Sequence, residues 1–269
     1  MTISNYIKKQ LPSFLIFSSI IFGAGIEDVE DYHKNSHLQW KAAISLMEGI
    51  EWTCSSRILD VGCGDGKITA FIAKELPEAI VVGTDISSEM IHFASHQHSQ
   101  HKNLLFLRAD AAHLSFEEQF DTVVSFSALH WVIDQEAALQ GIYKALLPGG
   151  KVHILTYAKA PMNICALSEN LIYSEKWNSY FPDYKPHRIH FTEEEYRNLL
   201  EKTGFTQLKL SQEWSQTIFS NRQVCKDFVS PLLDFAKHLS LELKEKFLDD
   251  LVDQISSLSE KNKNGTLIF

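Results

Sequence analysis

The most constraining feature of this chain is the stretch Ile58–Gly66, an apolar run that ends in three glycines spaced two residues apart. The glycines are Gly62, Gly64 and Gly66, and a helix-like sequence, Lys67–Leu76, follows them. A strand, a glycine turn and a helix in succession are typical of an α/β sheet that presents its backbone to a nucleotide-like ligand. Glycine permits strained backbone angles there and lets a ligand lie directly on the main chain.

The spacing of these glycines separates two classes of cofactor. A dinucleotide turn has the pattern G-x-G-x-x-G, whose last glycine would be residue 67, whereas the chain has Lys67 there. The sequence has no G-x-x-x-x-G-K-S/T phosphate loop either. The turn is therefore not expected to hold a pyrophosphate. Asp85 ends the next apolar run, Ile80–Thr84, and a carboxylate there can accept hydrogen bonds from both hydroxyls of a ribose.

Apolar runs alternate with a helix-like stretch farther along the chain. Leu104–Leu107 and Phe120–Phe126 predict two more strands, Glu136–Leu147 predicts a helix, and Lys151–Tyr157 predicts a fifth strand. Pro148–Gly150 is expected to stop the helix and turn the chain. Most of these strands are apolar on both faces, which predicts a buried parallel sheet. An ordinary tight turn, the plain interpretation of a lone glycine cluster, does not account for this order.

The motifs resemble those of a known family. Asp60–Gly66 has the form Asp/Glu-x-Gly-x-Gly-x-Gly, which resembles motif I of the class I methyltransferases that use S-adenosylmethionine. Two further pairs of segments narrow the resemblance to the trans-aconitate and juvenile hormone acid methyltransferases. They are Ala128–Val132 (Ala-Leu-His-Trp-Val) with Leu147–Gly150, and Tyr32–Ser36 with Gln39 upstream of motif I. Within this resemblance, motif I indicates the cofactor, and the Leu-His-Trp segment, Leu129–Trp131, indicates methyl transfer to a carboxylate.

The resemblance implies a fold and a domain arrangement. We expect an α/β fold with a doubly wound, seven-stranded, mostly parallel Rossmann-like sheet and helical cap elements. Residues 1–35 are expected to be an apolar N-terminal extension and residues 36–269 the methyltransferase domain, with a cap insertion at about 160–190. That insertion is rich in aromatic residues, and a surface helix with an apolar underside is the alternative interpretation.

The resemblance also implies a site for S-adenosylmethionine. The expected cofactor-binding residues are Tyr32, Gln39, Asp60, Gly62, Gly64, Gly66, Asp85, Ile86, Asp110, Ala111 and Ser127. The glycines would let the methionine part lie against the turn, while Asp60 orients its ammonium group and Asp85 takes the ribose hydroxyls. Asp110 would take the adenine amino group together with the backbone of Ala111, although an aspartate there could equally be a helix N-cap.

His130 and Trp131 are the candidate catalytic residues on the substrate side. The imidazole can donate a hydrogen bond to a carboxylate, and the indole offers an N–H group and an apolar wall. Core packing is an equally good interpretation of both side chains. Arg188 and Arg222 are candidate anchors for a second carboxylate, with surface arginines as the alternative.

The composition limits the partners. The formal net charge is −9, and the basic pair Lys8–Lys9 is the only basic cluster, so nucleic acid is not expected as a substrate. A small or carrier-linked molecule fits better, and the resemblance implies that it is an acid.

Neither a metal nor a disulfide is expected. Four cysteines lie far apart without a C-x-x-C pair (Cys54, Cys63, Cys165, Cys225), which argues against zinc and against structural disulfides. His96, His98 and His101 are interpreted as the solvated end of a helix rather than a ligand set.

The first 26 residues allow several interpretations. Lys8–Lys9 precede an apolar stretch, Leu11–Phe22, and then small residues, Gly23–Gly25, which is the pattern of a signal peptide. The stretch is short for a membrane span. A packed helix, a weak membrane foothold through residues 11–22 and a wrongly assigned start remain alternatives. The cofactor is made in the cytosol, so a cytoplasmic protein is expected.

Two local predictions concern the C-terminal half. Thr192 and Glu195 form a capping box at a helix start, and Phe191 can pack on Tyr196. Gly265–Phe269 is interpreted as the start of a final antiparallel strand.

Three function classes follow. The first is an enzyme, a methyltransferase that O-methylates the carboxylate of a small or carrier-linked organic acid. The second is a C- or O-methyltransferase of another small molecule such as a lipid quinone, which would need a base in the pocket. The third is a non-catalytic module that keeps the fold, and the intact acidic set Asp60, Asp85 and Asp110 argues against it.

Overall fold

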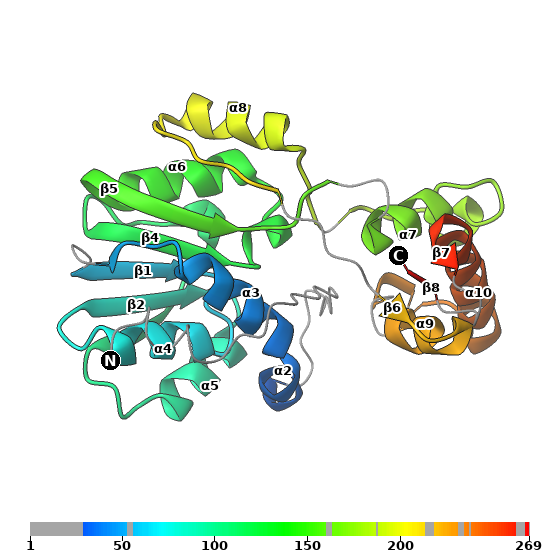
Figure 1. The fold of residues 1–269 in the computed structure, drawn as a ribbon, viewed down its shortest axis with the longest axis horizontal. Coiled ribbons are helices and arrows are strands. Elements are labelled where there is room, and N and C mark those ends of the chain that lie inside the picture. Colours follow the sequence, from blue (N-terminus) through cyan, green and yellow to red (C-terminus); the bar gives the residue numbers. More distant parts are fainter. Residues whose placement is uncertain are drawn as a thin grey trace. The chain divides into compact units, whose positions relative to one another are not determined.

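The structure, a computed structural model, describes residues 29–52, 56–159, 163–186, 188–212, 218–230, 234–236, 238–261 and 267–268. These residues belong to two compact units (Figure 1). Unit 1 comprises residues 29–52, 56–157 and 188–211, and unit 2 comprises the rest. The apolar stretch Leu11–Phe22 lies outside the described residues.

Unit 1 is built around a parallel sheet. Its elements in chain order are α2 (Val29–Asn35), α3 (His37–Met47), β1 (Arg57–Val61), α4 (Lys67–Glu75), β2 (Ile80–Asp85), α5 (Ser88–Gln97), β3 (Leu104–Arg108), the 3-10 helix η2 (Ala111–His113), β4 (Phe120–Phe126), the 3-10 helix η3 (Leu129–Trp131), α6 (Gln135–Ala145), β5 (Leu146–Leu155) and α8 (Glu193–Thr203). The strand order is β3-β2-β1-β4-β5, with every neighbouring pair parallel (Figure 1). The order places β1, with its glycine turn, at the centre of the sheet.

Helices cover both faces of this sheet, as the apolar strands predict. Because successive side chains of a strand point to opposite faces, Ile58 of β1 packs with Ile44 of α3 and Ile72 of α4 in one core cluster. Its neighbour Leu59 packs with Leu139 of α6 in the other, which also includes residues of α8. The fold is therefore doubly wound, and the predicted α/β, Rossmann-like class is confirmed.

The expected number of strands is wrong. Among the described residues the parallel sheet has five strands rather than seven. Residues 205–212, which follow α8, form no strand. The side chains of Leu208 and Leu210 still pack against the core cluster that contains residues of α6 and α8. The next strand residues, Ile218–Phe219, pair with Leu267–Ile268 in a separate sheet of unit 2.

The predicted turn Pro148–Gly150 lies within β5 rather than before it. Helix α6 ends at Ala145, and β5 begins at Leu146. The register between β4 and β5 shifts at this point, because Phe120 pairs with Leu146 whereas Thr122 pairs with Lys151. The turn residues thus form an irregularity inside a strand.

The start of α8 is as predicted. The Thr192 hydroxyl accepts a hydrogen bond from the Glu195 N–H at 3.2 Å, and the Glu195 carboxylate accepts one from the Thr192 N–H at 2.8 Å. The rings of Phe191 and Tyr196 lie 5.5 Å apart, centroid to centroid. The capping box and its apolar contact are therefore both present.

Phe106 of β3 fills a space that two glycines leave open. A Cβ atom on Gly66 would lie 2.5 Å from the Phe106 ring, and one on Gly83 of β2 would lie 2.7 Å from it. Both distances are shorter than any tolerated carbon contact, so the ring needs glycine at each position. The third glycine of the turn is thus required for packing as well as for its φ of +73°.

Unit 2 consists of helices and short strands. Its elements are α7 (Ile164–Ile172), the 3-10 helix η4 (Asn178–Tyr180), β6 (Ile218–Phe219), α9 (Arg222–Val229), the 3-10 helix η6 (Asp234–Ala236), α10 (Leu241–Leu258), β7 (Glu260–Lys261) and β8 (Leu267–Ile268). The strands form a small antiparallel sheet in the order β6-β8-β7. The expected final strand is therefore antiparallel, but it belongs to this sheet.

The interior of unit 2 is aromatic. The Trp177 indole N–H donates to the Asp250 carboxylate at 2.7 Å, and its ring lies 5.0 Å from the ring of Phe247.

Among the residues that the structure describes, no helix combines the length and the apolar character needed to cross a membrane.

Candidate active site

Three glycines form the turn between β1 and α4. Their φ angles are +78° at Gly62, +53° at Gly64 and +73° at Gly66. A Cβ atom on Gly62 would lie 2.2 Å from the Cβ atom of Ala128. The turn and the loop after β4 therefore approach each other too closely for any larger residue at this position.

Two predicted carboxylates flank the turn. Asp60 in β1 is 2% exposed, and its carboxylate accepts a hydrogen bond from the Thr69 hydroxyl at 2.7 Å. Burial raises the pKa of Asp60 to about 7, against the opposing effect of that hydrogen bond. Asp85 at the end of β2 accepts hydrogen bonds from the backbone N–H groups of Gly64 at 3.0 Å and Ser87 at 2.9 Å. Burial raises the pKa of Asp85 as well.

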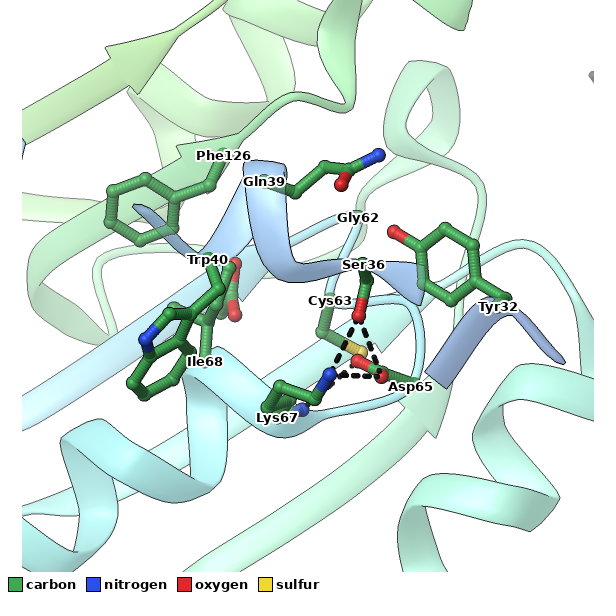
Figure 2. Close-up of a pocket in the computed structure, with 11 residues that line it drawn as sticks. Tyr32, Ser36, Gln39, Trp40, Gly62, Cys63, Asp65, Lys67, Ile68 and Phe126 are labelled. Carbon is green, nitrogen blue, oxygen red and sulfur yellow. Dashed lines mark hydrogen bonds and ion pairs between the residues drawn. The ribbon is translucent and has the colours of Figure 1, made fainter. Parts of the chain in front are cut away.

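A third carboxylate, Asp65, connects the turn to the N-terminal helices. His33 Nδ1 lies 2.7 Å and Lys67 Nζ 3.8 Å from the same Asp65 oxygen. Lys67 also donates to the Ser36 hydroxyl at 2.7 Å, and Figure 2 shows Ser36, Asp65 and Lys67 converging. From α5, His98 Nε2 lies 3.2 Å from the Asp65 carbonyl oxygen. We call these five residues the Asp65 network.

The sequence pattern gave no role to this network. His33 and Ser36 belong to the segment Tyr32–Ser36 that carries part of the resemblance, and Lys67 occupies the position of a dinucleotide glycine. These were the available signals. The interpretation of His98 as part of a solvated helix end is wrong, because its ring contacts the backbone of the turn.

The predicted residues Tyr32 and Gln39 line a cavity beside the turn (Figure 2). Asp60 and Gly62 line it too. The Tyr32 ring lies 3.6 Å from where a Cβ atom on Gly64 would be, so it covers the second glycine. Burial raises the pKa of the Tyr32 hydroxyl, which keeps it protonated at neutral pH.

The structure brings the predicted adenine residues to the end of β3, next to β2. The N–H of Ala109 donates to the Asp85 carbonyl at 2.9 Å. Asp110 is the N-cap of η2, which begins at Ala111, and its carboxylate accepts a hydrogen bond from the Ala112 N–H at 2.9 Å. Asp110 thus has the capping role that the sequence left open.

Ile86 and Ser127 follow the ends of β2 and β4, the two strands on either side of β1. Ile86 directly follows β2, and its side chain is 61% exposed, as an apolar surface available to a ligand would be. Ser127 directly follows β4 and has φ of +55°. A serine in the left-handed region stores strain, and such strain concentrates at functional sites.

Four rings lie together beyond the ends of β4 and β5, and we call them the imidazole cluster: His130, Trp131, Tyr157 and His190. His130 of η3 is 2% exposed, and its ring lies 5.3 Å from Trp131, 4.7 Å from Tyr157 and 6.1 Å from His190, between centroids. Burial lowers the pKa of His130 well below its ordinary value, and the neighbouring His190 and Arg188 lower it further. The ring is therefore neutral at physiological pH. Its Nδ1 atom has no hydrogen-bond partner among the described residues.

The two candidate arginines have different surroundings. Arg188 is 7% exposed, and its guanidinium carbon lies 4.1 Å from the centroid of the Trp131 ring. Arg222 forms ion pairs with Asp249 and Asp253 of α10 on the surface of unit 2. The structure therefore places Arg188 against the imidazole cluster and gives Arg222 the alternative interpretation, a surface arginine.

Comparison with known proteins identifies the family. A model of the methyltransferase domain matches residues 58–150. The juvenile hormone acid O-methyltransferase of Drosophila melanogaster is 30% identical over 213 residues, which cover 75% of this chain and 71% of that protein. The chain belongs to the S-adenosylmethionine-dependent methyltransferases. The trans-aconitate 2-methyltransferase of Deinococcus radiodurans is 34% identical to this methyltransferase over 121 residues, 45% of each chain.

A solved structure agrees with the fold of this methyltransferase. The Haemonchus contortus phosphoethanolamine N-methyltransferase 2, in complex with S-adenosyl-L-methionine, superposes with a TM-score of 0.51 at 19% identity. The match covers 87% of this chain and 57% of that chain. At this identity the likeness concerns the fold.

The residues around the turn of the methyltransferase fit S-adenosylmethionine in kind. The cofactor has an ammonium group and two ribose hydroxyls, and each of these donates hydrogen bonds. The carboxylates of Asp60 and Asp85 accept hydrogen bonds. Asp60 also lines the cavity beside the turn, together with Gly62. The individual contacts of the predicted residues remain predictions.

Proposed function

We propose that this methyltransferase O-methylates the carboxylate of a small or carrier-linked organic acid. The observation that carries the proposal concerns His130, which is buried, neutral and next to Trp131. Its Nδ1 atom has no hydrogen-bond partner among the described residues. A buried polar atom without a partner is costly, and an acceptor carboxylate would relieve that cost if Nδ1 carries the proton. Two relatives have the names of acid methyltransferases, which supports the same substrate class.

On the cofactor side we assign one role to each carboxylate. Asp60 faces the ammonium group, because it is buried and lines the cavity at the turn. Asp85 accepts the ribose hydroxyls, since it ends the neighbouring strand and is already oriented by the Gly64 N–H. Asp110 receives the adenine amino group on Oδ2, which also lies 2.8 Å from His113 Nδ1, alongside the backbone of Ala111. The remaining residues proposed to contact the cofactor are Tyr32, Gln39, Gly62, Gly64, Gly66, Ile86 and Ser127.

The chemistry asks little of the protein beyond positioning. Bound S-adenosylmethionine supplies a methyl carbon that is electrophilic because it is attached to a sulfonium. The acceptor oxygen forms a bond to this carbon while the carbon–sulfur bond breaks, and the electron pair of that bond stays on sulfur. A carboxylate is already ionised at neutral pH, so no general base is required. Alignment and exclusion of water can supply about 7–11 kcal/mol.

A tritiated-methyl assay tests the substrate class. The protein is incubated with labelled S-adenosylmethionine and with juvenile hormone acid, trans-aconitate or dodecanoate, and the product is treated with mild base. We expect label that base releases as methanol, as a methyl ester requires. Label that resists base would indicate a C-methyltransferase or another substrate. The absence of any S-adenosylmethionine binding in calorimetry would contradict the assignment of the site itself.

A variant of His130 tests the observation behind the proposal. His130→Phe keeps an aromatic ring but removes both ring nitrogens. We expect kcat/KM for the acid to fall roughly tenfold to a hundredfold, because a hydrogen bond to a charged group is lost. Cofactor affinity, measured by calorimetry, should stay within twofold. An unchanged kcat/KM would return His130 to a packing role.

The remaining expectations are also proposals. We infer a cytoplasmic location, an extension over residues 1–35, a methyltransferase domain over residues 36–269 and a cap insertion at about 160–190. A weak membrane foothold through residues 11–22 predicts that the full chain, but not a variant without these residues, co-sediments with anionic lipid vesicles. Equal recovery of both forms in the supernatant would exclude the foothold.

A further inference from the structure

The segment Arg188–His190 docks onto the imidazole cluster from a distant part of the sequence. The N–H of Ile189 donates to the His130 carbonyl at 2.8 Å. His190 Nδ1 lies 3.3 Å from the carbonyl oxygen of Tyr157, which follows β5. Backbone groups therefore fix this segment against the ends of β4 and β5, and the side chains on either side of Ile189 have defined positions.

Arg188 brings a permanent positive charge to this cluster. The guanidinium is nine-tenths buried and lies on the face of the Trp131 ring. The ring face stabilises the charge, and the planar guanidinium carries five N–H donors in a fixed geometry. Two parallel N–H groups of a guanidinium match the two oxygens of a carboxylate. An anion with planar oxygens is thus the ligand that this side chain suits best.

The two imidazoles add hydrogen-bond capacity without adding charge. The rings of His130 and His190 are nearly parallel, with an interplanar angle of 15°. His130 Nδ1 and His190 Nε2 are both buried and have no hydrogen-bond partner among the described residues. Burial, with the nearby Arg188 charge, lowers the pKa of both rings, so both are neutral. Neutral rings leave an acceptor carboxylate nucleophilic, whereas further cations would withdraw charge from its oxygens.

The cluster lies close to the cofactor turn. Ala128, two residues before His130, lies against the turn, because a Cβ atom on Gly62 would be 2.2 Å from its Cβ atom. Tyr157 contacts His130 edge-on. A carboxylate bound at the cluster would therefore lie near the methionine end of the cofactor, where the methyl group is expected.

From these observations we infer that Arg188, His130 and His190 form the binding site for the carboxylate of the methyl acceptor. The inference rests on the proposed function for the identity of the ligand. Arg188 supplies the charge and the two imidazoles supply further hydrogen bonds. His190, which belongs to the docked segment rather than to the sheet, supplies one of these hydrogen bonds through Nε2.

The test measures binding apart from transfer. The full chain, saturated with S-adenosylhomocysteine, is titrated by calorimetry with juvenile hormone acid, trans-aconitate and dodecanoate, and with dodecanamide as a neutral counterpart. We expect at least one acid to bind more tightly than the amide. Arg188→Gln should weaken binding of that acid roughly tenfold to a hundredfold, because a charge-assisted pair is lost. Arg188→Lys should recover part of it, and His190→Asn should weaken it severalfold.

The matched control is Arg197→Gln. Arg197 is a surface residue of α8 in the same unit and pairs with Glu193, so its replacement should leave acid binding within twofold. Unchanged cofactor affinity shows that each variant is folded. If Arg188→Gln does not fold, Arg188→Lys and His190→Asn decide. Arg188→Lys keeps the charge without the planar fork, and His190→Asn replaces the imidazole with a smaller amide that still forms hydrogen bonds.

The outcomes separate this inference from the proposed function. Acid affinity that stays within twofold in Arg188→Gln and His190→Asn overturns the inference, as does a wild-type chain that binds none of the three acids. A wild-type chain that binds an acid through Arg188 but transfers no tritiated methyl group to it contradicts the proposed function only. For an acid that is methylated, Arg188→Gln should raise KM more than it lowers kcat.

Discussion

The two halves of the sheet edge in unit 1 differ in charge. Around the turn after β1 and at the end of β2 lie three carboxylates, Asp60, Asp65 and Asp85. Beyond β4 and β5 lie a guanidinium and neutral imidazoles, including Arg188 and His130. The first half suits a ligand with an ammonium group and hydroxyls, and the second suits an anion. We therefore propose that the methyl donor binds in the first half, called the donor half below, and that the methyl acceptor binds in the second.

The largest expected effect concerns the backbone on which the donor half depends. Gly62→Ala would place a Cβ atom 2.2 Å from Ala128 at a φ of +78°, so we expect the free energy of unfolding to fall by about 3 kcal/mol. Gly149→Ala is the matched control in β5, with φ of +79° and nothing within 4 Å. It should lose about 1 kcal/mol. Urea unfolding measures both, and equal losses would show that the Ala128 contact is irrelevant.

The next effect tests whether the halves act independently. Asp85→Ala should weaken cofactor binding by at least ~1.5 kcal/mol, about tenfold, because two charge-assisted hydrogen bonds are lost. The affinity of this variant for the acid, measured with saturating S-adenosylhomocysteine, should not change. Arg188→Gln is expected to give the reverse pattern. Calorimetry gives the affinity of each of the two variants for the cofactor and for the acid. A variant that binds both ligands equally more weakly would contradict the independence of the two halves.

A smaller effect concerns the pH dependence of the donor half. The pKa of Asp60 is about 7 in the folded chain, against an ordinary 3.8, and its ionised form is the one that attracts an ammonium group. Cofactor affinity should therefore rise about fivefold between pH 6 and pH 7, below the range in which the amino group of the cofactor itself loses its proton. Asp60→Asn should remove most of this dependence. A flat profile in the wild-type chain would show that Asp60 does not face the ammonium group.

The same pKa has an opposite consequence for the stability of the chain without cofactor. Because the folded state binds the Asp60 proton more tightly than the unfolded state does, this group's contribution to the free energy of unfolding falls as the pH rises from about 4 to about 7. Urea unfolding at several pH values, compared with Asp60→Asn, isolates that contribution.

The smallest effect distinguishes the two arginines. Arg222→Gln removes exposed ion pairs with Asp249 and Asp253, so the free energy of unfolding should change by at most about 1 kcal/mol. Acid affinity should be unchanged. A weakened acid affinity would revive the alternative in which Arg222 anchors a carboxylate.

Local sequence signals predicted much of the fold. The glycine turn at 62–66 and the five strands of the parallel sheet follow from periodicity and from glycine chemistry, and the capping box at Thr192 depends on residues three apart. The number of strands was overestimated because the resemblance supplied it. Nothing in the pattern of residues 205–212 distinguishes side-chain packing on a core from pairing with β5.

The site was predictable where single residues lie close to the ends of strands. Asp60 is in β1, one residue before its end, and Asp85 is the last residue of β2; both lie beside the turn. The Asp65 network and the docking of Arg188–His190 onto His130 were not predicted, because the residues in contact lie far apart in the sequence and meet only in the folded chain. His190 had no local signal at all.

The ring of Phe106 has a consequence for how this chain can diverge. Because it occupies the volume next to both Gly66 and Gly83, a methyl group at either glycine becomes tolerable only when the ring is first exchanged for something smaller. Positions 66, 83 and 106 should therefore covary among homologues, and Phe106→Ala should act as a compensatory change for Gly83→Ala.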